Sequence, residues 1–262
     1  MSAAGLVARA RSPWYLIERN ALVYRRRWMV VVSGLFEPLF YLLAMWLGLA
    51  RLIDEVPGPG GEPIGYLAFV APGLLAAAAM LGSLSEATYR LFLKIVEGRS
   101  YQGMLATPLT VTDLCVGELG WAMVRGILYT VGFLAVAVPL GAVTSWWAVL
   151  CLPVALLVCV AFAALGQAAT TYMRTWQDLD LTQLAAVPLL LCSTTFFPLD
   201  AYPRALQLVV EATPLFHGVA LMRALTTGHV HAGLAVHVLY LAAAAAVGLR
   251  WSSRRLGPRI LG

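Results

Sequence analysis

The chain has 262 residues, of which 61% are hydrophobic and only 12% are charged, and its mean hydropathy is +0.81. Soluble domains carry about a quarter charged residues, so this composition excludes a water-soluble domain and indicates an integral membrane protein. The formal net charge is +5. Because the basic residues gather on one side of the apolar stretches, topology and anionic lipid headgroups explain this charge, and no nucleic-acid partner is expected.

The first 27 residues predict an amphipathic helix that lies on the inner surface of the membrane and contacts its lipid. Ser12 and Pro13 suit the N-cap and the first helical position. Aromatic and apolar residues, beginning with Trp14 and Tyr15, then recur at helical spacing among basic ones. This pattern is typical of interfacial helices. A merely basic topological anchor is the alternative.

Six apolar stretches follow, each long enough for a helix to cross a hydrocarbon core of about 30 Å. The sequence therefore predicts an all-α integral membrane fold, with a single domain over residues 1–262. The predicted spans cover residues 28–50, 64–88, 119–140, 148–173, 181–197 and 232–251.

The basic residues predict the orientation, because basic loops resist translocation across the membrane. With six spans both termini share one side, and 14 of the 18 basic residues fall on it. These are Arg9, Arg11, Arg19, Arg25, Arg26, Arg27, Arg90, Lys94, Arg99, Arg174, Arg250, Arg254, Arg255 and Arg259. Both termini are therefore expected in the cytoplasm. The first span, and not a cleavable signal peptide, is expected to direct insertion.

Between the second and third spans, residues 89–118 form a connector much longer than two neighbouring helices need. It mixes charged with apolar residues, so it predicts a docking surface; a solvated connector is the alternative. The candidate docking residues are Glu97, Gly98, Arg99, Tyr101, Met104 and Leu105.

The segment 198–228 is apolar, but Pro198, Pro203 and Pro214 divide it into pieces too short to span a membrane. Such pieces can enter a bilayer and return where protein shields their backbone ends. Two short re-entrant helices on the outer side are therefore predicted. A folded outer loop is the alternative.

Two ionisable residues, Glu37 and Arg125, are predicted inside the membrane, where a charge is costly. The sequence favours a structural pair between them, or a kink at Pro38, over a proton relay. A relay would point to a transporter driven by an ion gradient.

Catalytic chemistry has little support in the sequence. It contains no HExxH motif and no nucleophile elbow, so no catalytic residue and no metal site are expected. The four cysteines lack CxxC spacing and are expected to be small core residues. The one lysine, Lys94, is followed by Ile95, so no GxxxxGK[ST] phosphate loop is present. Energy for transport must therefore come from a partner or from an ion gradient.

Several motifs resemble the ABC type 2 exporter permease family. They are the runs EPLFYL at 37–42, Gly48-Leu49, EGR at 97–99, MLATP at 104–108, FFPLDAYP at 196–203 and PLFHGV at 214–219. The resemblance covers nearly the whole chain in the same order. It is nearest to the nodulation lipo-oligosaccharide exporter permeases, and more distant from the daunorubicin exporter permeases.

The resemblance implies a six-span half-transporter with an amphipathic N-terminal helix, a cytoplasmic coupling helix after the second span and two re-entrant helices between the fifth and sixth. It implies an ATP-driven exporter in a bacterial-type inner membrane, in which two separate ATPase subunits bind ATP and Mg and this chain holds no cofactor. The docking residues above would then couple ATP hydrolysis to transport. The implied substrate is hydrophobic or amphipathic, as in the export of drugs, glycolipids or lipids; drug efflux would confer antibiotic resistance.

A second copy, or a paralogue, is expected to face this chain through spans one, two and five around a narrow apolar path. The candidate lining residues are Phe36, Tyr41, Phe69, Met80, Phe196 and Phe197. Ordinary packing or lipid contact is the alternative for each of them. For the whole chain, the alternatives are a gradient-driven secondary transporter and a membrane scaffold without transport.

Overall fold

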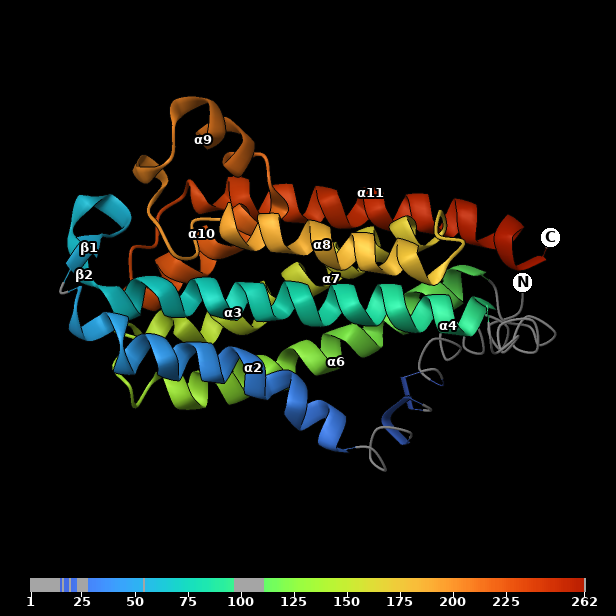
Figure 1. The fold of residues 1–262 in the computed structure, drawn as a ribbon, viewed down its shortest axis with the longest axis horizontal. Helices are drawn as coiled ribbons and strands as arrows, with labels where there is room; N and C mark the ends of the chain where they lie inside the picture. The colour runs from blue at the N-terminus through green and yellow to red at the C-terminus, as the bar shows by residue number, and fades with distance from the viewer. Residues whose placement is uncertain are drawn as a thin grey trace.

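Long helices lie side by side along the longest axis of the molecule in Figure 1, a computed structural model that describes residues 15, 17–18, 20–22, 28–53, 55–96 and 111–261. The helices are α2 (Trp28–Leu47), α3 (Tyr66–Ser85), α4 (Leu91–Val96), α6 (Val111–Ala137), α7 (Cys151–Thr170), α8 (Trp176–Leu191), α9 (Arg204–Glu211), α10 (Pro214–Thr227) and α11 (Leu234–Leu261). The short elements are η1 (Leu49–Arg51), β1 (Glu55–Pro57), η2 (Pro59–Gly61), β2 (Pro63–Gly65), η3 (Glu86–Arg90), η4 (Trp146–Leu150) and η5 (Leu199–Ala201).

Helix α3 forms the centre of the bundle, and nearly all of its residues are buried. It packs against α2, α6, α7 and α10. Alanine and glycine make up much of its sequence, and small residues let neighbouring backbones approach closely. At Gly73, for example, a Cβ atom would lie 2.9 Å from the Cα of Thr195, so a larger residue would push that segment away.

The two ends of the bundle differ. At one end β1 and β2 pair as an antiparallel hairpin, with Val56 opposite Ile64. Gly60 and Gly61 have φ values of +81° and +83° in its turn, a conformation that glycine adopts without steric cost. We call this the hairpin end. The opposite end, which carries the end of α4 and the C-terminus in Figure 1, is the distal end.

Four helical stretches in the described residues are long and apolar enough to cross a membrane: Tyr66–Leu93, Cys115–Ala137, Trp146–Thr170 and Leu234–Leu256. They overlap the predicted second, third, fourth and sixth spans but begin and end at other residues. Helices α2 and α8 occupy the predicted first and fifth spans but are not among the four. Helix α8 has 16 residues, a length of about 24 Å at 1.5 Å per residue. The fold is therefore an all-α membrane bundle, and six spans stay a prediction.

Helices α9 and α10 follow one another with a bend of 83°. Pro214 begins α10, and the Thr213 side chain accepts a hydrogen bond from the Phe216 N–H at 3.4 Å, which caps the helix. Two short helices therefore lie within the segment 198–228, where the sequence predicts them. Together they also form the fifth candidate span if a bent pair counts as one. Their re-entry into a membrane stays a prediction.

The connector predicted over 89–118 is shorter than expected at both ends. After α3 the chain continues as helix through η3 and α4 to Val96, and α6 begins at Val111. The helix persists because η3 is a π-helical turn that accommodates the change of register without a break. The docking residues Glu97, Gly98, Arg99, Tyr101, Met104 and Leu105 lie outside the described residues, as does nearly all of the predicted interfacial helix over 1–27.

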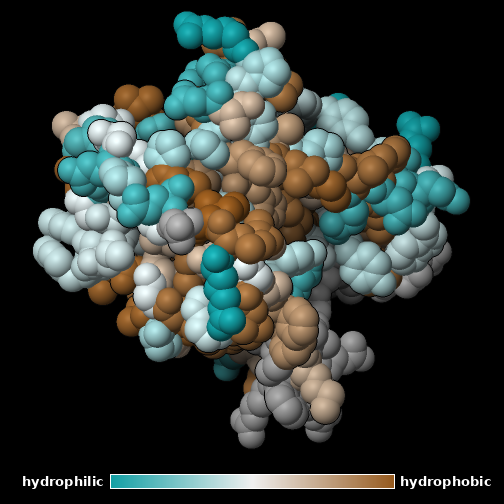
Figure 2. Space-filling model, turned by 60° about the vertical axis from the view of Figure 1, so that its left-hand side comes forward, coloured by the Kyte–Doolittle hydropathy of each residue, from teal (hydrophilic) through white to brown (hydrophobic). Residues whose placement is uncertain are grey.

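Apolar side chains cover much of the outer surface. Figure 2 shows them in brown between hydrophilic groups in teal. Many belong to α2, α8 and α11, including Phe36, Leu184 and Val236, which are more than half exposed. An exposed apolar surface of this extent is characteristic of a protein that contacts lipid or a partner chain.

Candidate functional site

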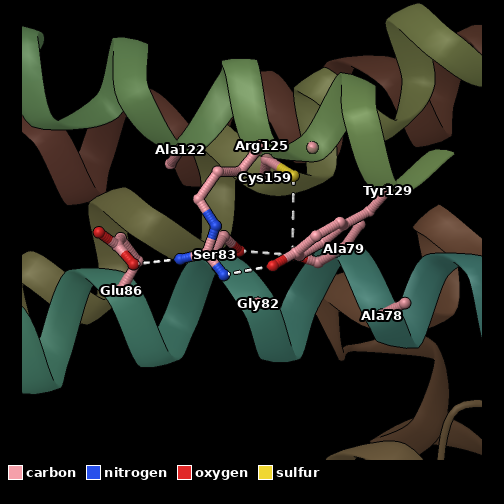
Figure 3. Close-up of a pocket in the computed structure, with 10 residues that line it drawn as sticks. Ala78, Ala79, Gly82, Ser83, Glu86, Ala122, Arg125, Tyr129 and Cys159 are labelled. Atoms are coloured by element: carbon pink, nitrogen blue, oxygen red, sulfur yellow. Dashed lines mark hydrogen bonds and ion pairs between the residues drawn. The ribbon is translucent and has the colours of Figure 1, made fainter. Parts of the chain in front are cut away.

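A buried ion pair lies between α3 and α6 (Figure 3). Arg125 of α6 donates to the carboxylate of Glu86, the first residue of the π-helical turn η3, and to the Tyr129 hydroxyl oxygen at 2.5 Å. The two charged side chains are 13% and 7% exposed. Charge-assisted bonds of this kind are stronger than neutral ones. The pair therefore joins the helix that enters the predicted coupling segment to the helix that leaves it.

A second group of polar side chains continues from Glu86 toward α7. Glu86, Glu118 and Gln167 line a small cavity, and all three are buried. The Gln167 Nε2 donates to the Cys115 carbonyl oxygen at 3.4 Å, and its Oε1 is buried without a hydrogen-bond partner among the described residues. Polar groups from η3, α6 and α7 thus meet in one place, which we call the polar junction.

Helix α7 stabilises the π-helical turn directly. The Thr170 hydroxyl donates to the Ala87 carbonyl oxygen at 3.2 Å. One turn earlier, a Cβ on Gly166 would lie 3.2 Å from the Ala87 Cβ and 3.1 Å from a Leu84 methyl carbon. The close approach at Gly166 therefore brings α7 against the turn, and π-helical turns occur often at functional sites.

The predicted pair between Glu37 and Arg125 is wrong in this structure, because Glu86 takes the place of Glu37. Glu37 is exposed on α2, whereas Glu86 lies on the helix next to Arg125. The contact between α2 and α6 falls one turn away from Glu37, at Gly34, where a Cβ would lie 2.3 Å from the Tyr129 hydroxyl. The rotation of α2 about its axis thus keeps Glu37 out of the interior.

The candidate lining residues divide into two groups. Phe36, Tyr41 and Phe197 are exposed, at 61%, 49% and 57%, and Phe196 is half-buried. In contrast, Phe69 and Met80 are 2% and 0% exposed, so their prediction as lining residues is wrong for this structure. Both lie on α3, whose faces are covered by other helices of the same chain.

A groove of about 180 Å³ opens between η3 and the start of α8. Tyr89 and Trp176 line it with ring centroids 6.2 Å apart, and Asp180 and Gln183 add polar groups. Leu184, Val187 and Leu191 continue along the same face of α8 as Asp180, at intervals of three or four residues. A polar, aromatic groove therefore adjoins an apolar stripe, an arrangement that suits an amphipathic molecule.

Arg223 is a residue whose role the sequence does not predict. The sequence places it with the few basic residues on the outer side, yet in the structure it is only 7% exposed. Its Nε donates to the Phe69 carbonyl oxygen at 3.1 Å, and an Nη donates to the Thr194 carbonyl oxygen at 2.6 Å. The available sequence signal is a single arginine on the otherwise uncharged helix α10.

Histidines and cysteines do not assemble into a metal site within the described ranges, where no group of three or more His, Cys, Asp or Glu is placed to hold an ion. His217 and His237 face each other with their Nδ1 atoms 2.7 Å apart, and His217 stacks on Tyr240 at 3.9 Å. These rings join α10 to α11. Cys115, Cys151 and Cys159 are buried thiols, in agreement with their prediction as core residues, whereas Cys192, for which the same was predicted, is half-buried.

Comparison with known proteins agrees with this architecture. The family model described as ABC-2 type transporter matches residues 12–226. Nodulation protein J of Rhizobium leguminosarum bv. viciae is 33% identical over 223 residues, which cover 84% of each chain. Nodulation protein J of Rhizobium meliloti is 32% identical over 226 residues, again 84% of each chain, and that of Sinorhizobium fredii is 31% identical over 238 residues, 87% of each. The chain therefore belongs to the ABC-2 type transporter family, as a multi-pass membrane permease.

Proposed function

We propose that this chain is the membrane subunit of an ATP-driven exporter that moves a hydrophobic or amphipathic substrate outward. The observation that carries this proposal is the family match over residues 12–226, which covers α2 to α9 and all but the last residue of α10. Because the sequence contains no GxxxxGK[ST] loop, two separate ATPase subunits bind ATP and Mg and supply the energy.

The proposed topology has six spans, adding α2 and α8 to the four longer helical stretches. Arg90, Lys94 and the arginines at the C-terminal end of α11 all belong to the distal end, which supports a cytoplasmic location for it. The hairpin end then faces outward. There α9 and α10 form the two re-entrant helices, a proposal supported by their short length and by the 83° bend between them.

The substrate path is proposed to form between two copies of the chain, or between this chain and a paralogue. Helix α8 makes few contacts within its own chain and exposes Leu181, Leu184 and Val187. Helix α2 exposes Phe36 and Phe40, whose ring centroids are 5.3 Å apart. Joining these faces across a dimer encloses an apolar passage. The groove beside Trp176 lies at the cytoplasmic mouth of this passage and binds the polar part of an amphipathic substrate.

Coupling is proposed to occur at Glu97, Gly98, Arg99, Tyr101, Met104 and Leu105, between α4 and α6. Movement of this segment by the ATPase subunits is transmitted to the bundle through the two flanking helices, α4 and α6. The ion pair of Glu86 and Arg125 joins α6 to the helical stretch that leads into α4, so the two move together.

The decisive experiment is purification of the tagged chain from its native membrane in mild detergent, followed by an assay of vanadate-sensitive ATP hydrolysis. We expect a stoichiometric subunit that carries a phosphate loop, and hydrolysis that depends on it. Repeated recovery of the chain alone, without hydrolysis, would contradict an ATP-driven exporter and favour a gradient-driven carrier or a scaffold.

A further inference from the structure

Arg223 is a charged side chain buried at the hairpin end without a carboxylate partner among the described residues. A buried charge is costly, so its hydrogen bonds must compensate for the loss of water. Its Nε and one Nη donate to backbone carbonyl oxygens, those of Phe69 on α3 and Thr194 after α8. The guanidinium carbon also lies 3.8 Å from the centre of the Phe69 ring, a cation–π contact. Arg223 thus joins three separate segments of the chain.

The segment that Arg223 holds is a strained turn. Thr194 has a φ of +58°, the one positive φ among the described non-glycine residues, and a β-branched residue adopts this conformation only at an energetic cost. Ser193, Thr194 and Thr195 are all buried, and the Ser193 and Thr195 hydroxyls lie 2.8 Å apart. Strained backbone of this kind persists where contacts from outside the segment enforce it.

The strained turn also has little room to move inward. It packs on α3 at Gly73, where an added Cβ would lie 2.9 Å from both the Cα and the Cγ2 of Thr195. The next two residues along the chain are Phe196 and Phe197, candidate lining residues of the path. The position of the turn therefore determines where these two rings lie.

We propose that Arg223 is a positioning residue that latches the 193–195 turn against α3, and that release of this latch opens the outer end of the substrate path. Arg223 holds the turn to α3 by one hydrogen bond to the Thr194 carbonyl oxygen and one to the Phe69 carbonyl oxygen, while the strained backbone of the turn favours release. Movement of α10 relative to α3 withdraws both hydrogen bonds at once and frees Phe196 and Phe197. This inference rests on the proposed export function for its direction, but the latch itself is testable without it.

Cys192, which directly precedes the turn and is half-buried, serves as a natural reporter. The other three cysteines are buried and should react slowly with a membrane-impermeant maleimide. The rate of Cys192 labelling is measured on the full chain in intact cells and in inside-out vesicles, without any ATPase subunit. R204Q is the matched control, because it removes a positive charge from exposed Arg204 at the same end without touching the turn.

We expect Cys192 to be labelled at least about tenfold faster in R223Q than in wild type, since hydrogen bonds from a charged donor are lost. In R204Q it should be labelled at the wild-type rate. T194G keeps the carbonyl acceptor and removes the strain, so it should label more slowly than wild type and lower transport. G73A pushes the turn outward while Arg223 is intact, so it should label faster. This variant keeps the test decisive if R223Q does not fold.

The latch would be overturned if Cys192 were labelled at the wild-type rate in folded R223Q, or faster than wild type in T194G. Labelling changes that occur from the cytoplasmic side would keep the latch but contradict the proposed orientation. If the labelling changes as expected while no ATPase subunit copurifies, the latch stands and the ATP-driven function fails.

Discussion

Loss of Arg125 alone or of Glu86 alone should destabilise the protein far more than loss of both members of this ion pair. The perturbation is a double-mutant cycle of R125M, E86L and the combined variant. In each single variant one charge stays buried opposite an apolar group. The remaining side chains are too deeply buried, at 13% and 7% exposure, for solvent to screen that charge.

The expected magnitude follows from this burial. Breaking a buried pair from one side costs about 3–5 kcal/mol, whereas replacing both partners with apolar groups of similar volume is often close to neutral. Arg125 also donates to the Tyr129 hydroxyl at 2.5 Å, and this bond is lost in both R125M and the double variant at a cost of about 1 kcal/mol. We therefore expect a coupling energy of at least about 2 kcal/mol between the two sites.

The assay is the free energy of unfolding of the purified chain in one detergent, measured for all four members of the cycle. E37Q is the matched control, because Glu37 is exposed on α2 and should change stability by less than about 0.5 kcal/mol. Additive effects of the two single substitutions would refute the reasoning. A large effect of E37Q would instead restore Glu37 as the partner of Arg125.

Three further predictions concern other parts of the chain. G248L should destabilise the contact of α11 with α7 by about 1–3 kcal/mol, because a Cβ added at Gly248 would lie 2.8 Å from α7 backbone atoms. Thermal unfolding measures this change, and an unchanged midpoint would argue against the close contact. The backbone N–H groups of Arg174 and Thr175 donate to the Asp178 carboxylate and lower its pKa. The stabilisation that Asp178 contributes is therefore present above the ordinary pKa of the carboxyl and is lost as pH falls through the lowered pKa. The thermal midpoint of D178N should accordingly fall less between pH 6 and pH 3 than that of wild type. Replacing Glu97 and Arg99 together by alanine should abolish export in vesicles while leaving membrane insertion and ATP hydrolysis by the partner intact, and normal export would rule out this coupling site.

The sequence determines the membrane bundle and the approximate position of its main helices. A helix that crosses lipid must satisfy its backbone hydrogen bonds within itself and expose apolar side chains, so composition and length alone reveal it. Some proline positions act just as locally: Pro203 directly precedes α9 and Pro214 is the first residue of α10, positions where the missing N–H of proline costs no helical hydrogen bond. The absence of a phosphate loop is also a property of the sequence alone.

The tertiary structure decides which side chains meet. The sequence predicts Glu37 as the partner of Arg125, whereas the rotation of α2 keeps Glu37 exposed and the turn η3 places Glu86 against Arg125. Likewise the sequence predicts Arg223 as one of the outer basic residues, whereas in the structure α10 packs against α3 and Arg223 is buried. Such contacts depend on helix rotation and register, which glycines at the crossing points set by admitting a neighbouring helix. Helix rotation is a property of pairs of helices and not of any one of them, so no periodicity within a single stretch of sequence contains it.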